Sequence, residues 1–161
     1  TRSEAGEETY LSELTQITSK VDTFNKNSIA IIYTGIYDDN IQDDVQSTIA
    51  YQKQIIDKIG TDKYLVIGLT SKRTFEYVDD VNAVLKDAYG EHFLDFRSYL
   101  LENGLDDANI EPTDEDLDDI DNGYIPSSLL QDNLINGNAE FNELLAKCIY
   151  SKLSELNYIE S

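Results

Sequence analysis

The segment KYLVIGLTS (residues 63–71) decides the fold that the sequence predicts. It is a short apolar run that ends in small polar residues, which is typical of a buried strand. Apolar residues recur at three- to four-residue spacing in the segment before it, 41–59, and in the segment after it, 78–88. These spacings predict helices, the first capped by Asn40 and ended by Gly60. A strand between two helices predicts crossover connections and a parallel sheet.

The same alternation extends in both directions along the chain. SIAIIYTG (28–35) and EHFLDFR (91–97) have the character of further strands. A helical stripe at 8–22 precedes the first strand, and a last amphipathic helix is expected over about 139–156. We therefore expect a single domain over 1–161, of the α/β class, with a mostly parallel sheet covered by helices on both faces.

Composition narrows the classes of partner. The 161 residues can bury a substantial core. The 12 basic and 32 acidic residues give a formal net charge of −20, which disfavours nucleic acid and anionic membranes as partners. No apolar run approaches the roughly 20 residues of a membrane span, and we expect no cofactor. The only cysteine, Cys148, lies in a helical pattern, so we interpret it as a small core residue.

Negative charge is concentrated in GLDDANIEPTDEDLDDIDNG (104–123), which we interpret as an acidic helix-loop insertion. Thr113 and Asp116 have the spacing of a capping box, which predicts a short helix. An EF-hand loop does not fit, because Ile120 falls at a ligand position when Gly123 is placed at the loop's invariant glycine. We therefore predict a solvated acidic surface and no metal site, with weak calcium binding left open.

The loop SLLQDNLINGN (128–138) has the setting of a catalytic loop, because it stands between the acidic segment and the last helix. It offers one carboxylate, Asp132, and several asparagines. The chain's only histidine, His92, precedes the third strand, whereas ligands bind at the carboxyl ends of parallel strands. A Ser-His-Asp site cannot be assembled from this chain alone.

The order of several motifs resembles that of the SGNH (GDSL-type) hydrolases. YLVIGLTS (64–71), the long stretch from AYGEHF to LLQDN (88–133) and IYSKLSELNYI (149–159) are similar to the family's C-terminal half. TRSEAGEET (1–9) and IIYTGIYDD (31–39) are similar to its second and third blocks. The resemblance implies a three-layer α/β/α, flavodoxin-like fold, serine ester hydrolysis, and an extracellular, cell-surface or phage-associated location.

The family's functional residues are largely missing when they are matched one at a time. The resemblance places the Gly-Asp-Ser nucleophile block before Thr1, so we expect the family's central first strand either in a preceding segment of the natural polypeptide or replaced by N-terminal residues or by a second chain. Gly6 and Gly35 match glycines of the second and third blocks. Tyr37 stands where the family has its oxyanion asparagine, and a phenol cannot replace a carboxamide in the same space.

The last block departs from the family pattern as well. Asp132 matches the aspartate that orients the histidine. The histidine position itself falls on Ile135 when counted forward from Asp132, and on Asn136 when counted back from the last helix. Neither residue can act as a general base at neutral pH. We therefore interpret Asp132 as a hydrogen-bonding residue of the loop or of the helix start.

Three functions stay open at this point. The first is a catalytically degenerate SGNH-like domain that acts as a binding, interaction or structural module for a small molecule or a protein. The second is part of an esterase for carbohydrate or lipid esters, with serine and histidine supplied outside this chain. The third is an acidic domain that binds a partner through residues 104–123.

Overall fold

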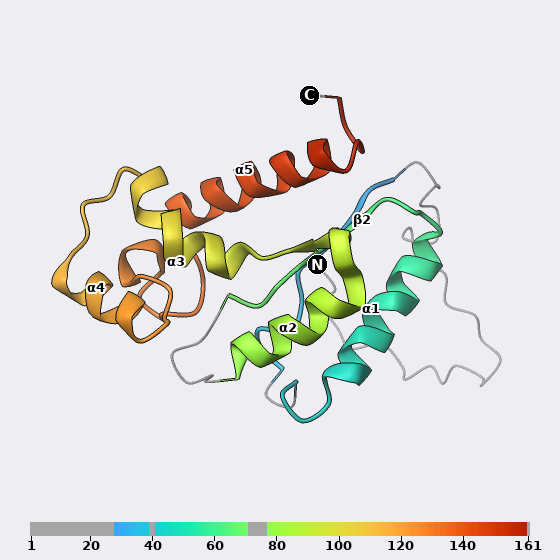
Figure 1. The fold of residues 1–161 in the computed structure, drawn as a ribbon, viewed down its shortest axis with the longest axis horizontal. Helices are drawn as coiled ribbons and strands as arrows, with labels where there is room; N and C mark the ends of the chain where they lie inside the picture. The colour runs from blue at the N-terminus through green and yellow to red at the C-terminus, as the bar shows by residue number, and fades with distance from the viewer. Residues whose placement is uncertain (1–27, 39–40, 71–76, 161) are drawn as a thin grey trace, which may run out of the picture.

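The computed structural model describes residues 28–38, 41–70 and 77–160, and Figure 1 shows its fold. The helix predicted over 8–22 and the predicted cap Asn40 lie outside these ranges. The elements in chain order are β1 (Ala30–Ile32), α1 (Val45–Ile59), β2 (Tyr64–Ile67), α2 (Val78–Tyr89), the 3-10 helix η2 (Gly90–His92), β3 (Phe93–Leu94), α3 (Phe96–Asp107), α4 (Asp114–Asp121), the 3-10 helix η3 (Ser127–Leu129) and α5 (Ala139–Glu155).

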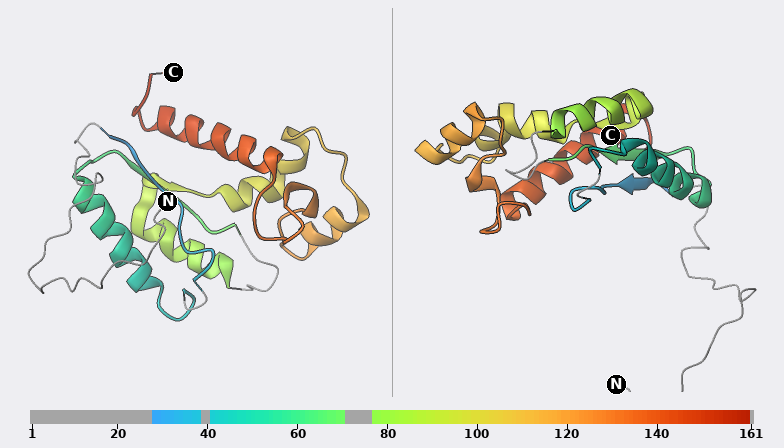
Figure 2. Two further views of the ribbon diagram at one scale, coloured as in Figure 1. Left: turned by 180° about the vertical axis from the view of Figure 1, so that it is seen from behind. Right: turned by 90° about the horizontal axis from the view of Figure 1, so that it is seen from below.

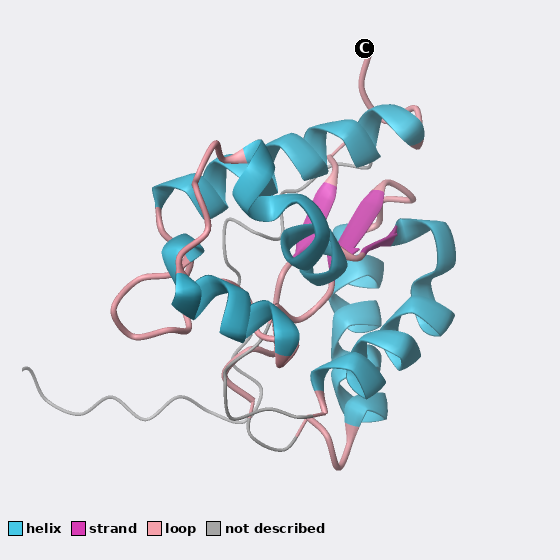
Figure 3. Ribbon diagram, turned by 60° about the vertical axis from the view of Figure 1, so that its left-hand side comes forward, coloured by secondary structure: helices cyan, strands magenta, loops and turns pink. Residues whose placement is uncertain are grey.

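The sheet has three parallel strands in the order β1-β2-β3 (Figure 3). Ala30 of β1 pairs with Tyr64 of β2, and Val66 of β2 pairs with Phe93 of β3. The prediction of an α/β fold with a parallel sheet is therefore confirmed. The segment that decided the prediction forms the central strand, where Val66 is completely buried.

Side-chain caps account for two differences from the prediction, one at a helix start and one at the end of a predicted strand. Asp44 caps α1, which begins at Val45, four residues after the predicted start. Asp95 caps α3, so the predicted strand over 91–97 is reduced to Phe93–Leu94. An aspartate cap satisfies amide groups that a helix would otherwise leave unpaired, and this local gain competes with strand extension.

Two hydrophobic clusters cover the sheet from opposite sides. Val66 packs in a cluster with residues of α1 and α2, and its neighbour Ile67 packs in a cluster with residues of α3 and α5. Neighbouring side chains of a strand point to opposite faces, so the two clusters lie on different faces of β2. Figure 2 shows α1 and α2 side by side, with α5 along the other side of the strands.

The acidic segment forms the predicted helix, α4, but only part of it is solvated. The capping box is confirmed, because the Thr113 hydroxyl accepts from the Asp116 amide at 3.1 Å and the Asp116 carboxylate accepts from the Thr113 amide at 2.9 Å. Asp116 is 0% exposed and Asp119 is 5% exposed. The predicted solvated surface is therefore wrong for these two carboxylates, which bind neighbouring backbone instead of water.

Two further sequence interpretations concern the helices. Cys148 is half-buried and packs against the cluster that contains Ile67, which agrees with a packing role, and burial raises the pKa of its thiol. Within the described ranges, no helix combines the length and apolar character that a membrane span requires.

Candidate functional site

The loop that the sequence singled out is closed on itself by backbone hydrogen bonds. Leu130 and Gly137 form an antiparallel bridge, and the Gln131 amide donates to the Asn136 carbonyl at 2.8 Å. Inside this ring, the Asn133 side-chain oxygen accepts from the amides of residues 135 and 136, each at 3.0 Å. The Asn133 side chain thus gives these two amides the hydrogen-bond acceptor that the backbone of a tight turn cannot supply.

Buried carboxylates of α4 anchor the start of this loop. Asp116 accepts from the amide of Ser128 at 2.9 Å and from its hydroxyl at 2.8 Å. Asp119 accepts from the amide of Ser127 at 2.9 Å and from its hydroxyl at 2.6 Å. Burial raises the pKa of Asp116, but hydrogen bonds from Ser128 and Thr113 outweigh it and hold the pKa below its usual value.

The end of the loop is fixed by the first turn of α5. Asn138 caps this helix, because its side-chain oxygen accepts from the Phe141 amide at 3.0 Å. Its side-chain nitrogen donates to the Ser128 carbonyl at 2.8 Å, which ties the two ends of the loop together. A Cβ at Gly137 would collide with the ring of Phe141, so the bridge position requires glycine. The loop is therefore held at both ends.

Tyr37 reaches this loop from the carboxyl end of β1. Its hydroxyl donates to the Asn136 side-chain oxygen at 2.6 Å, across 99 residues of sequence. Gly35 permits the approach, because it has a positive φ of 106° and a Cβ there would stand 2.8 Å from a methyl carbon of Ile41. The turn after Gly35 then places Tyr37 on the surface, where it is 60% exposed.

Arg97 joins the end of β2 to the acidic segment. Its guanidinium donates to the Thr70 carbonyl at 3.2 Å and to the Gly123 carbonyl at 2.6 Å, and it forms an ion pair with Asp79 at 2.8 Å. The hydrogen bond from Arg97 holds the pKa of Asp79 below its usual value. The Thr70 hydroxyl is also 3.0 Å from the Tyr33 hydroxyl. The buried Arg97 therefore connects this edge of the sheet to the acidic segment and to Asp79.

The structure brings together only some of the predicted site residues. Tyr37 and Asn136 meet, Gly35 supports their contact, and Ile135 lies half-buried beside Asn136. Gly6 lies outside the described residues. The role assigned to Asp132 is wrong: within the described ranges its exposed carboxylate has no hydrogen-bond partner, and the nearby asparagines make the loop and helix-start hydrogen bonds instead.

The groups that meet here suit binding better than proton transfer. A phenol and a carboxamide donate and accept hydrogen bonds without changing charge near neutral pH. The chain's only histidine, His92, lies at the opposite end of the sheet against Tyr64. Among the described residues, no group of three or more histidine, cysteine, aspartate or glutamate side chains is placed to hold a metal ion.

Sequence reasoning missed two residues that shape this site, Asn133 and Arg97, whereas the resemblance matches Asn138 to the family asparagine that follows the histidine position. Arg97 carries a signal, because it is the last basic residue before Lys147 in a strongly acidic stretch. An isolated arginine of this kind favours a buried, fully hydrogen-bonded position. Asn133 carries no comparable signal, because asparagine is common in any polar loop.

Comparison of the chain with protein-family models, with curated proteins and with solved structures finds no match. The function is therefore inferred from the side chains of the site and from their contacts.

Proposed function

We propose that the chain is a catalytically degenerate SGNH-like domain that binds a neutral polar ligand where its carboxyl-end loops meet. The observation that carries the proposal is the 2.6 Å hydrogen bond between Tyr37 and Asn136. The resemblance places Tyr37 at the oxyanion asparagine, and it places Asn136 at the catalytic histidine when the position is counted back from the last helix; these two groups line one site in the family. If both family groups had been replaced, the replacing side chains would still be in contact, as Tyr37 and Asn136 are.

The edge of the sheet offers a place for the family's first strand. Within the described ranges, no strand pairs with the outer edge of β1. Ile31 is 46% exposed and Tyr33 is 37% exposed, on the same face of that strand. A further strand beside β1 would pair the open edge, and the helix that connects it to the sheet could cover this exposed face. This supports the three-layer α/β/α arrangement that the resemblance implies.

The side chains at the site favour binding over catalysis. Ester hydrolysis by a serine mechanism requires a nucleophile, a base and oxyanion donors, and the loss of one of them removes most of the rate. Neither Tyr37 nor Asn136 supplies a nucleophile or a base. The Asn136 side-chain oxygen accepts from Tyr37, and the same carboxamide keeps an N–H donor for a ligand.

The binding proposal is tested by titrating the isotope-labelled protein with N-acetylglucosamine and, separately, with monobutyrin, followed by NMR. These probes represent the carbohydrate and lipid-ester classes. We expect one of them to shift the Asn136 side-chain amide signals saturably. Tyr37→Phe should weaken that binding by about fivefold through loss of one hydrogen bond. Tyr51→Phe, an equally conservative change at a 66% exposed tyrosine of α1, is the matched control.

The same protein is assayed for turnover of p-nitrophenyl acetate. The unfolded chain is the control, because unfolding destroys a catalytic site but leaves the reactive side chains present. We expect the folded protein to show no turnover above that of this control. Turnover that a serine-directed phosphonate abolishes would replace the proposal with the esterase alternative. Titrations in which neither probe shifts Asn136 would remove the ligand-binding part of the proposal.

One observation favours the acidic partner-binding alternative. Leu117 of α4 is 52% exposed and is surrounded in sequence by Asp114, Asp118 and Asp121. An exposed leucine among carboxylates would suit a basic partner with an apolar anchor. Replacing the three aspartates with asparagine should abolish capture of such a partner at low salt, and capture that persists would exclude this function.

A further inference from the structure

A cavity lies at the amino ends of the strands, away from Tyr37 and Asn136. Its volume is about 650 Å³, and the residues that matter here are Lys53, Ile56, Asp57, Asp62, Tyr64 and His92. α1 supplies one wall, and the beginning of β2 and the 3-10 helix η2 supply the other. The volume is within the range of about 300–1,000 Å³ that is usual for small-molecule sites.

His92 is held in this cavity in a defined orientation. Its Nδ1 lies 3.2 Å from the Tyr64 carbonyl oxygen, which can only accept, so Nδ1 carries the hydrogen. The Tyr158 hydroxyl lies 3.0 Å from the same nitrogen and donates to the Asp62 carbonyl at 3.1 Å. The neutral imidazole therefore presents Nε2 as an acceptor. This nitrogen is 3.9 Å from the Glu91 carboxylate.

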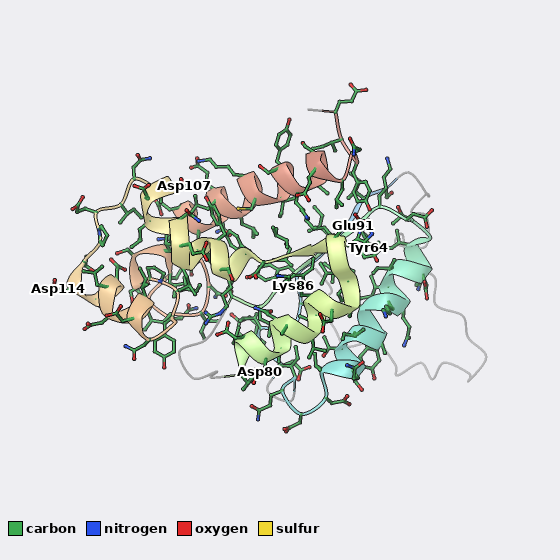
Figure 4. The ribbon with its side chains drawn as sticks, in the orientation of Figure 1. Tyr64, Asp80, Lys86, Glu91, Asp107 and Asp114 are labelled. Carbon is green, nitrogen blue, oxygen red and sulfur yellow. The ribbon has the colours of Figure 1, made fainter. Side chains whose placement is uncertain are left out.

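Aromatic stacking fixes the ring further. The rings of Tyr64 and His92 are parallel to within 18°, with centroids 4.1 Å apart. The Tyr158 ring stacks with His92 as well, at 6.2 Å. Figure 4 shows Tyr64 and Glu91 close together beside the C-terminal half of α1. The cavity thus has a rigid aromatic wall that carries a fixed hydrogen-bond acceptor.

The charges around the cavity favour a cationic ligand. The exposed carboxylates of Asp57 and Asp62 form no hydrogen bond or ion pair within the described ranges. The two nearby lysines direct their ammonium groups at aromatic rings: Lys53 lies 6.0 Å from the Tyr89 ring centroid, and Lys63 lies 5.9 Å from the Tyr158 centroid. The net charge of −20 adds attraction for a cation.

We infer that this cavity binds a small organic cation that carries N–H donors on an apolar body, such as an alkylguanidinium. Its N–H groups bind Asp57, Asp62 and Nε2 of His92, and its apolar part packs against Ile56 and Tyr64. The inference is independent of the proposed function, because the two sites share no residue. The same carboxylates disfavour an anionic ligand.

The single histidine makes this site directly observable. The Hε1 proton of His92 gives one resonance, which we would follow by NMR at constant pH. The probes are butylguanidinium and its neutral isostere butylurea. We expect butylguanidinium to shift the His92 signal saturably, and butylurea to bind at least about tenfold more weakly, because it lacks the charge that both carboxylates attract.

Two double variants distinguish a specific binding site from general electrostatic attraction by the acidic protein. The pair Asp57→Asn and Asp62→Asn should weaken butylguanidinium binding by about fivefold. The control pair, Asp114→Asn and Asp118→Asn, changes the net charge equally on α4, which Figure 4 shows at the other side of the molecule. Binding should be unchanged in this control.

Other outcomes would overturn the inference. A shift of the His92 signal that never saturates would show charge screening instead of binding. Equal weakening in both double variants would show that net charge alone attracts the probe. Butylurea binding as tightly as butylguanidinium would exclude recognition of the charge. A nitrogen-15 spectrum with the hydrogen of the neutral ring on Nε2 would remove the acceptor on which the geometry depends.

Discussion

Replacement of Asp116 with asparagine tests how the acidic helix supports the functional loop. Its two carboxylate oxygens accept four hydrogen bonds, from the amide and hydroxyl of Thr113 and from the amide and hydroxyl of Ser128. Asparagine has almost the same shape, but it turns one of these acceptors into a donor. The variant therefore sets an NH₂ group against groups that also donate.

The expected cost follows from the hydrogen bonds that are lost. Oδ2 of Asp116 accepts three of the four and Oδ1 accepts one, from the Ser128 amide, so asparagine keeps the most hydrogen bonds with its NH₂ group at the Oδ1 position. The hydrogen bond lost there contributes about 1.5 kcal/mol or more, and the Ser128 amide that is left facing another donor costs about as much again, so we expect a loss of about 3 kcal/mol in the free energy of unfolding. Asp118→Asn, at an exposed position of the same helix, is the matched control. Its effect should stay within about 0.5 kcal/mol.

The pH dependence of this difference has a defined sign. The pKa of Asp116 is lowered in the folded protein, so the unfolded state binds a proton more readily than the folded state. The stabilisation by ionised Asp116 is therefore fully present above the unfolded pKa, and it is lost as the pH falls through the folded pKa. The difference between the parent protein and Asp116→Asn should narrow in acid.

Urea unfolding followed by circular dichroism, at about pH 7 and about pH 2, measures these differences. Hydrogen exchange at the Ser128 amide is a second readout, because this amide donates to Asp116. The reasoning fails if Asp116→Asn costs no more than Asp118→Asn, or if its cost is the same at both pH values.

Three further changes test other parts of the site. Arg97→Met should lower the free energy of unfolding by about 3 kcal/mol in urea, because the buried Thr70 carbonyl and the partly buried Gly123 carbonyl lose their donor; a loss below about 1 kcal/mol would contradict this. Gly137→Ala should lower it by about 2 kcal/mol through collision with the Phe141 ring, and an unchanged thermal midpoint would show that the loop adapts. Asn133→Ala should change the free energy of unfolding by less than about 1 kcal/mol. It should nevertheless speed hydrogen exchange at the amides of residues 135 and 136, because both lose their acceptor. Unchanged exchange would exclude Asn133 as the acceptor for these amides.

Local physics made several features of the fold predictable. The apolar run at 63–71 is the central strand, and Gly60 ends α1 in a left-handed conformation. The Thr113 capping box and the extent of α5 also match the prediction. Each of these depends on residues close together in sequence, where spacing and side-chain type suffice. Helix starts were less predictable, because aspartates at neighbouring positions compete to cap the same turn.

The sequence by itself determined the α/β class, the parallel order of elements and the high negative charge, because these follow from periodicity and composition. Only the tertiary structure decided which polar groups are internal. Asp116 and Asp118 have the same chemistry on the same helix, yet only Asp116 faces Ser128. Tyr37 meets Asn136 across 99 residues. Such contacts depend on how the elements pack, and a packed arrangement fixes distances that no local pattern encodes.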